Sequence, residues 1–106
     1  MQIAERVVGG VVVVVVTGDI TLNKGDIVLK DKVQSLMHQG HVQLLVDLGG
    51  VSYMDSAGLG QLVQAYATVS KHGGSLKLLR VTKRLKDLLT ITKLVTVFES
   101  YDDEAT

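Results

Sequence analysis

Six consecutive valines, Val11 to Val16, constrain the fold of this chain more than any other feature of its sequence. Because valine branches at Cβ, it favours extended backbone, and the run predicts a β-strand. A strand that is apolar at every position is apolar on both faces, which is typical of a strand at the centre of a covered sheet. The longest apolar stretch, Val7 to Val16, has only ten residues and contains two glycines, whereas a membrane-spanning helix needs about 20. The valines therefore predict a core strand and no membrane span.

Length, charge and cysteine content narrow the class of protein. The 106 residues fit one compact domain, which we predict to span residues 1–106. Eleven basic residues balance eleven acidic ones, and direct nucleic-acid binding is disfavoured because it would require a basic excess. The chain has no cysteine, which excludes a disulfide scaffold and a thiolate-rich zinc site. The N-terminus lacks the basic start and the cleavage site of a secretion signal. These features are consistent with a cytoplasmic location.

Eleven glycines and no proline divide the chain into segments. The predicted elements are a strand at about 3–8, a hairpin turn at Gly9-Gly10, the valine strand ended by Gly18-Asp19, a helix at about 24–39, a strand at 42–48 closed by Gly49-Gly50, a helix at 61–71, a strand at 76–80, a third helix that Thr82 caps, and a short last strand at 95–98. After the opening hairpin, strands alternate with helices, which predicts right-handed crossovers and a mixed sheet with helices packed on it. The predicted fold class is α/β, or α+β by a stricter definition.

One segment, from Asp47 to Leu62, carries the residues best suited to a functional site. Asp55 and Ser56 lie between a buried strand and a helix, so that Ser56 is at or near the start of the helix. There the unpaired backbone N–H groups and the helix dipole favour negative charge, and a phosphate on the serine hydroxyl would be tolerated. Alternatively, Asp55 or Ser56 only caps the helix, a role that both residue types favour. The spacing alone favours the capping interpretation, because such junctions are common.

Other features give weaker indications. His38 and His41 form a His-x-x-His pair, but a glycine between them ends the helix, so we expect no metal site. The segment from Lys71 to Lys93 holds seven of the eleven basic residues and one acid, Asp87. It could dock an acidic partner or a phosphate-bearing ligand, although a solvated helix face is the favoured interpretation. A hydrolase is poorly supported, because Met54 stands where a nucleophile elbow needs glycine.

Residues 47–60 read Asp-Leu-Gly-Gly-Val-Ser-Tyr-Met-Asp-Ser-Ala-Gly-Leu-Gly. This stretch resembles the signature of the STAS-domain anti-sigma factor antagonists, a bacterial partner-switching family. The similarity extends to Gly-Asp-Ile at 18–20, to Lys-His-Gly-Gly-Ser-Leu-Lys-Leu at 71–78 and to the third helix with its following residues at 84–94. The resemblance implies a STAS fold: a mixed β-sheet of about four to five strands opened by a hairpin, with about three to four helices packed on it. It also implies a regulatory binding protein that is not an enzyme and needs no cofactor.

The resemblance further implies that Ser56 is phosphorylated by a partner anti-sigma factor that is also a serine kinase. The unphosphorylated form would bind this kinase and release its client sigma factor, phosphorylation of Ser56 would abolish the binding, and a PP2C-type phosphatase would reverse the modification. The implied partner-binding surface consists of Asp19, Thr21, Asp55, Ser56, Ala57, Gly58 and Leu59. Within this surface, Gly58 would allow a close approach of the partner, and Leu59 would be partly an anchor for the partner and partly core.

Some positions depart from the family pattern. Ala57 stands where the family often has a second hydroxyl residue, which makes Ser56 the only acceptor in the motif. Thr21 stands where many members have aspartate, and Lys93 replaces a usual glycine after the third helix. Two other functions would keep the same fold: a partner-switch protein that regulates a target other than a sigma factor, and a STAS module that binds a nucleotide or a lipid near the start of the second helix.

Overall fold

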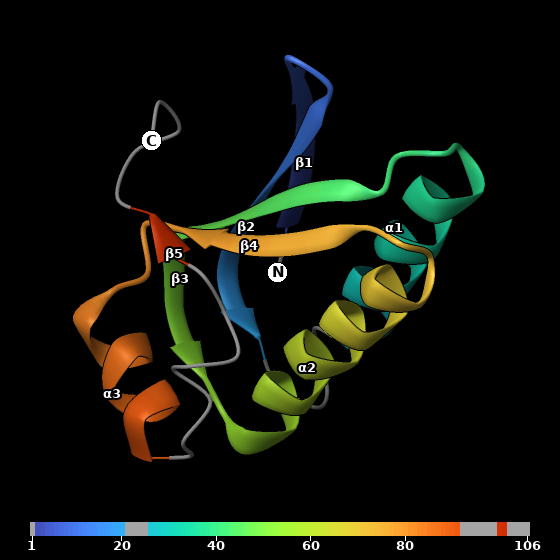
Figure 1. Ribbon diagram of the computed structural model, residues 1–106. Helices are drawn as coiled ribbons and strands as arrows, with labels where there is room; N and C mark the ends of the chain where they lie inside the picture. The colour runs from blue at the N-terminus through green and yellow to red at the C-terminus, as the bar shows by residue number, and fades with distance from the viewer. Residues whose placement is uncertain (1, 21–25, 92–99, 102–106) are drawn as a thin grey trace.

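The computed structural model describes residues 2–20, 26–91 and 100–101. In chain order the elements are β1 (Gln2–Val8), β2 (Val11–Ile20), α1 (Asp26–His38), β3 (Gln43–Met54), α2 (Ser56–Lys71), β4 (Ser75–Leu79), α3 (Lys83–Ile91) and β5 (Ser100–Tyr101). The five strands form one sheet in the order β1-β2-β3-β4-β5, in which β1 is antiparallel to β2 and all other neighbours are parallel (Figure 1). The predicted mixed sheet opened by a hairpin is confirmed.

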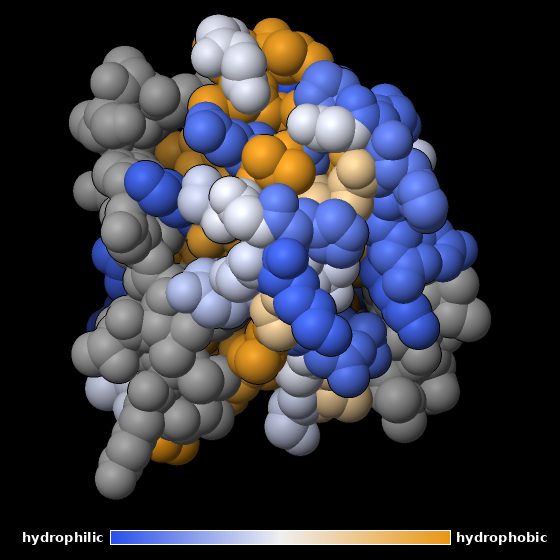
Figure 2. All heavy atoms as spheres, turned by 45° about the vertical axis from the view of Figure 1, so that its right-hand side comes forward, coloured by the Kyte–Doolittle hydropathy of each residue, from blue (hydrophilic) through white to orange (hydrophobic). Residues whose placement is uncertain are grey.

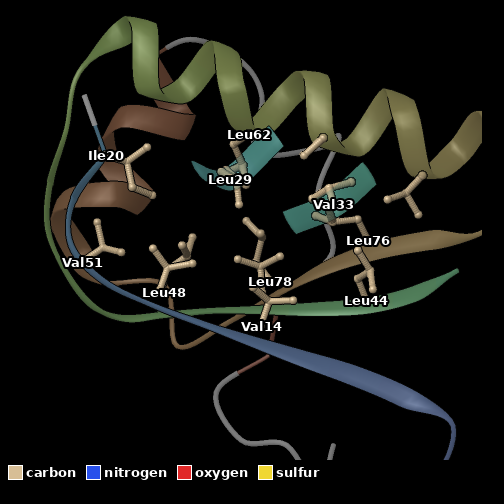
Figure 3. Close-up of a cluster of buried hydrophobic side chains, with 14 of the residues drawn as sticks. Val14, Ile20, Leu29, Val33, Leu44, Leu48, Val51, Leu62, Leu76 and Leu78 are labelled. Atoms are coloured by element: carbon tan, nitrogen blue, oxygen red, sulfur yellow. The ribbon is translucent and has the colours of Figure 1, made fainter. Parts of the chain in front are cut away.

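The core lies between the sheet and the helices α1 and α2, which run side by side over one face of the sheet (Figures 1 and 3). Because side chains alternate along a strand, every second residue of β2, β3 and β4 points toward the helices. These inward residues are Val12, Val14, Val16, Leu44, Val46, Leu48, Leu76 and Leu78, and they meet Leu29, Val33 and Leu36 of α1 and Leu62, Ala65 and Val69 of α2. The apolar strands and the helical spacing together build a single two-layer core.

The valine strand is buried toward the helices and also carries a buried residue on its other face, where Val13 is 1% exposed. Two strand ends were predicted wrongly, because β2 continues through Gly18 to Ile20 and β3 continues through Gly49 and Gly50 to Met54. These glycines lie inside paired strands instead of ending them. At Gly50, an added Cβ would lie 2.7 Å from Cγ2 of Thr17 on β2, so glycine permits the two strands to lie close together.

The helix bounds also differ from the prediction at one point. The second helix begins at Ser56, which confirms the expected position of this residue at the helix start. The bound of residue 61 was wrong, because the glycine-containing motif forms the first turns of the helix. The cap of α3 is confirmed, since the N–H of Leu85 donates to Oγ1 of Thr82 at 3.4 Å. The predicted strand at 95–98 lies outside the described residues. No helix of the described part of the chain is long and apolar enough to cross a membrane.

Candidate functional site

The ends of β2 and β3 and the start of α2 meet at one edge of the molecule. In the parallel register, Asp19 pairs with Tyr53 and Ile20 pairs with Met54. The backbone N–H of Asp55 then donates to the carbonyl of Ile20 at 3.3 Å, which joins the turn after β3 to the end of β2. The structure therefore brings Asp19 next to the Tyr53–Ser56 segment, although more than thirty residues separate them in the chain.

Asp55 is the N-cap of α2, and Ser56 is the first residue of the helix. Asp55 has extended backbone, with φ −89° and ψ 179°, and its Oδ1 accepts the N–H of Gly58 at 2.7 Å. This contact satisfies one of the backbone donors that every helix start leaves without an intrahelical partner. The Ser56 side chain is exposed, and no described residue forms a hydrogen bond with its hydroxyl. The two alternatives from the sequence are thus divided between two residues: the aspartate caps the helix, and the serine faces solvent.

Gly58 and Leu59 occupy internal positions. Gly58 was expected to face a partner, whereas Leu59 was expected to be partly core, and its place in the core is confirmed. An added Cβ on Gly58 would collide with the backbone carbonyl of Ile20, so glycine allows α2 to approach the end of β2 in the same chain. Leu59 is 4% exposed and belongs to the core. The close approach at Gly58 is therefore between two parts of this chain, α2 and the end of β2. Leu59 anchors the start of α2 to the core. Ala57 is half-buried, and Thr21 lies outside the described residues.

A groove runs between the start of α2 and the helix α3. It has a volume of about 410 Å³ and is lined by Tyr53, Met54, Asp55, Ser56, Arg84, Leu85, Asp87, Leu88 and Ile91. Two apolar residues of this lining are unusually open to solvent: Tyr53 is 46% exposed and Ile91 is 78% exposed. Exposed large apolar residues beside polar ones are typical of surfaces that contact other proteins. The sequence offered the segment from Lys71 to Lys93 as a possible docking segment but did not place α3 beside the Asp55-Ser56 motif, because nothing in the spacing of the two segments shows that they adjoin.

Asp47, at the start of the same sequence segment, has a structural role that the sequence did not reveal. Its carboxylate is 3% exposed, forms a salt bridge with Arg80, and accepts the N–H of Gly49 at 2.9 Å. Arg80 follows β4 and has φ +54°, a left-handed conformation that is uncommon for a residue with a side chain. Burial alone would raise the pKa of Asp47, but the hydrogen bonds from Arg80 and Gly49, together with the positive charges of Arg80 and Arg6, lower it below its ordinary value.

The described residues offer no obvious metal centre. No group of three or more His, Cys, Asp or Glu side chains within them could hold a metal ion.

Comparisons with known proteins agree with this architecture. The family model described as "Mlab, STAS domain" matches residues 3–98. The anti-sigma-B factor antagonist of Bacillus subtilis is 44% identical over 72 residues, which are 68% of this chain and 65% of that protein, so the matched part spans slightly less than two thirds of that relative. The anti-sigma F factor antagonist of Paenibacillus polymyxa is 24% identical over 95 residues, which are 90% of this chain and 81% of the relative.

Solved structures show the same fold. A crystal structure of a putative anti-sigma factor antagonist from Thermotoga maritima superposes with a TM-score of 0.88 at 20% identity, covering 97% of this chain and 88% of that one. The unphosphorylated form of the anti-sigma factor antagonist SpoIIAA gives a TM-score of 0.73 at 18% identity, covering 98% of this chain and 91% of that one. The family model, the relatives and the fold confirm the resemblance seen in the sequence: this chain belongs to the STAS domain family, and the relatives that it resembles are anti-sigma factor antagonists.

Proposed function

We propose that this protein is an anti-sigma factor antagonist that acts in the cytoplasm by reversible binding and not by catalysis. Its unphosphorylated form binds an anti-sigma factor with serine kinase activity, and this binding releases the client sigma factor. Phosphorylation of Ser56 by the bound kinase abolishes the complex, and a PP2C-type phosphatase restores the binding form.

The observation that carries this proposal is the position of the Ser56 side chain. It is exposed at the first position of α2, next to a cap that holds the backbone of the turn in place. A kinase can therefore reach the hydroxyl without unfolding any part of the helix. Ala57 follows directly, so Ser56 is the only hydroxyl residue of the motif after Asp55. The names of the relatives support the assignment, and one related protein, SpoIIAA, has been solved in both unphosphorylated and phosphorylated forms.

The surface around Ser56 explains how one phosphate could prevent binding. A phosphate adds about −1.5 to −2 charges and three acceptor oxygens. It would join Asp55 beside it and Asp87 across the groove, both of which line the same hollow. A partner that fits the unmodified surface would then meet a bulky dianion among carboxylates. Since each 1.4 kcal/mol lost is about a tenfold loss of affinity, no change of fold is required.

The contact surface that we propose follows from exposure. Ser56, Asp55, Ala57 and Asp19 are exposed or half-buried and can touch a partner, whereas Gly58 and Leu59 support them from inside. Thr21 remains a predicted member of this surface from the sequence alone.

The test begins with the intact mass of the protein purified from its own cells, with and without phosphatase treatment. We expect a phosphatase-sensitive gain of one phosphate in the wild type and in Ser70→Ala, a matched variant that removes an exposed serine at the far end of α2. We expect no such gain in Ser56→Ala. The absence of phosphate on the wild type under growth and under stress would contradict the proposal.

The second step identifies the partner. Ser56→Ala cannot accept phosphate, so we expect it to capture the kinase from a lysate more completely than the wild type does, and mass spectrometry then identifies the kinase and its client. Capture of a sigma factor regulator supports the proposal, whereas a kinase whose client is another kind of protein overturns the sigma-factor assignment.

A further inference from the structure

We propose that Arg84 of α3 is the intramolecular partner of a phosphate on Ser56, and that phosphorylation draws its guanidinium across the groove between α2 and α3. This inference rests on the proposed phosphorylation of Ser56 and specifies what the phosphate does within the same site. In the reaction, Oγ of Ser56 takes the γ-phosphoryl group of ATP, its proton passes to a base of the kinase, and ADP leaves.

The position of Arg84 is the first reason. Arg84 and Ser56 line the same groove, one from α3 and the other from the start of α2. The Arg84 side chain is exposed, and its Nη1 donates to the backbone carbonyl of Ser52 at 3.5 Å, a distance at the weak limit for a hydrogen bond. Within the described part of the chain, Arg84 forms no salt bridge. Its guanidinium can therefore change partner with little loss.

The charges of the groove are the second reason. Among the described residues that line it, Asp55 and Asp87 are acidic and Arg84 is the only basic one. Asp55 already accepts the N–H of Gly58, which commits one of its oxygens to the helix cap. A dianionic phosphate placed beside these carboxylates is repelled by both and is attracted by one cation. Guanidinium binds phosphate through two parallel charge-assisted hydrogen bonds, which are stronger than a long bond to a neutral carbonyl.

The path between the two groups is the third reason. The guanidinium of Arg84 contacts the carbonyl of Ser52 near the end of β3. The chain continues from there to the end of β3 at Met54 and then to the start of α2 at Ser56. Tyr53 is nearly half-exposed in the groove between them. A guanidinium stacks well on an aromatic face, so the Tyr53 side chain offers it an apolar surface within the same groove. Phosphorylation would then cover an apolar part of the groove as well as add negative charge.

The experiment uses the full chain with phosphoserine incorporated at position 56 during translation, so that it does not depend on finding the kinase. The pKa of the second phosphate ionisation is measured by phosphorus NMR at low salt in three proteins: the parent, Arg84→Gln and Lys83→Gln. Lys83 is exposed on α3, carries the same charge and does not line the groove. Its substitution therefore measures the effect of losing one positive charge nearby.

We expect the phosphate pKa to rise by about half a unit or more in Arg84→Gln, because a cation in contact stabilises the dianion. The rise in Lys83→Gln should be much smaller. In addition, the side-chain Nε–H signal of Arg84 should shift when the phosphoserine protein is compared with the unmodified one. Equal pKa values in the two variants, or an unchanged Arg84 signal, would overturn the inference.

These outcomes separate the two proposals. A raised phosphate pKa in Arg84→Gln together with no phosphate on Ser56 in cells would establish the contact and overturn the proposed function. Phosphorylated Ser56 in cells with equal pKa values would support the proposed function and overturn the role of Arg84.

Discussion

Asp47 and Asp55 lie on the same stretch of chain, one inside β3 and one directly after it, and make similar local contacts. Asp47 accepts the N–H of Gly49 at 2.9 Å, and Asp55 accepts the N–H of Gly58 at 2.7 Å. Their surroundings differ: Asp47 is buried against Arg80, whereas Asp55 is half-buried at the edge of the groove. The same contact between a carboxylate and a backbone N–H thus serves two roles. The buried Asp47 stabilises the sheet, and the more exposed Asp55 shapes a surface site.

The two aspartates are nevertheless parts of one arrangement. The salt bridge from Asp47 holds Arg80 at the end of β4, and the chain then passes through Thr82, the cap, into α3. Arg80 also has its backbone in the left-handed region, with φ +54°, which is uncommon for a residue with a side chain. The buried pair therefore sets the point from which α3 starts, and α3 forms one wall of the groove beside Ser56.

The largest effect is expected from Arg80→Ala, which leaves the buried Asp47 carboxylate without its ionic partner. Breaking a buried pair from one side is strongly destabilising, and we expect the free energy of unfolding to fall by about 3 kcal/mol. The value lies at the low end for such pairs because the Arg80 side chain is 54% exposed, so water can reach the site after its removal. Urea denaturation followed by circular dichroism measures the change.

Two further variants separate the loss of the salt bridge at Arg80 from the strain of its left-handed backbone, and test whether Arg80 and Asp47 are coupled. Arg80→Gly loses the same salt bridge but removes the cost of a side chain at φ +54°, so it should be less destabilised than Arg80→Ala by about 1 kcal/mol. Asp47→Asn combined with Arg80→Ala should lose less than the sum of the two single variants, because no buried charge is then left alone. Strict additivity would show that the pair is not coupled.

The next effect in size is expected at Gly58, in the first turn of α2. An added Cβ collides with the carbonyl of Ile20, so Gly58→Ala must push the helix away from the end of β2 and should cost about 2 kcal/mol of unfolding free energy. Gly60 is the matched control, because an added Cβ there meets nothing within 4 Å. Gly60→Ala should leave stability equal or raise it by about 0.5–1 kcal/mol. Equal losses in both variants would contradict the packing role of Gly58.

The sequence predicted the layers of this fold better than the contacts of its site. The valine run, the alternating elements and the Asp55-Ser56 junction follow from local preferences that neighbouring residues carry. The sequence predicted that the glycines at 49 and 50 end a strand and that Gly58 contacts a partner. Their roles in the structure depend instead on close packing against Arg80, Thr17 and Ile20, which are far away in the chain. Likewise, nothing in the spacing indicates that Arg84 lies across from Ser56. Long-range packing decides such pairs, and local sequence patterns do not record it.

A smaller effect is expected when the cap of α2 is removed. Asp55→Ala loses the acceptor for the N–H of Gly58 and should reduce the free energy of unfolding by about 1 kcal/mol. Asp55→Asn keeps an oxygen acceptor and removes the charge, so it should be nearly as stable as the wild type. The pair of variants also separates the cap from the charge in partner binding. If Asp55→Asn were as unstable as Asp55→Ala, the negative charge would matter more than the cap.

The smallest effect is the contribution of Asp47 to the dependence of stability on pH, because it reflects only the difference between the folded and unfolded pKa. The folded state lowers the pKa of Asp47 below its ordinary value of 3.8. The carboxylate therefore stabilises the fold fully above this value, and the stabilisation is lost as the pH falls through the lower, folded pKa. Urea midpoints between pH 7 and about pH 3 should fall less steeply in Asp47→Asn than in the wild type. Asp31→Asn, which removes an exposed carboxylate on α1, controls for the loss of one negative charge.

If Asp47→Asn kept the full acid sensitivity of the wild type, the ion pair between Asp47 and Arg80 would not be a source of that sensitivity. The contrast between the buried Asp47 and the surface Asp55 would then rest on packing alone. Asp31 is exposed on α1, so its substitution disturbs no buried contact. The outer surface of α1 and α2 is largely hydrophilic (Figure 2). Any difference between Asp47→Asn and Asp31→Asn therefore comes from the buried pair of Asp47 and Arg80.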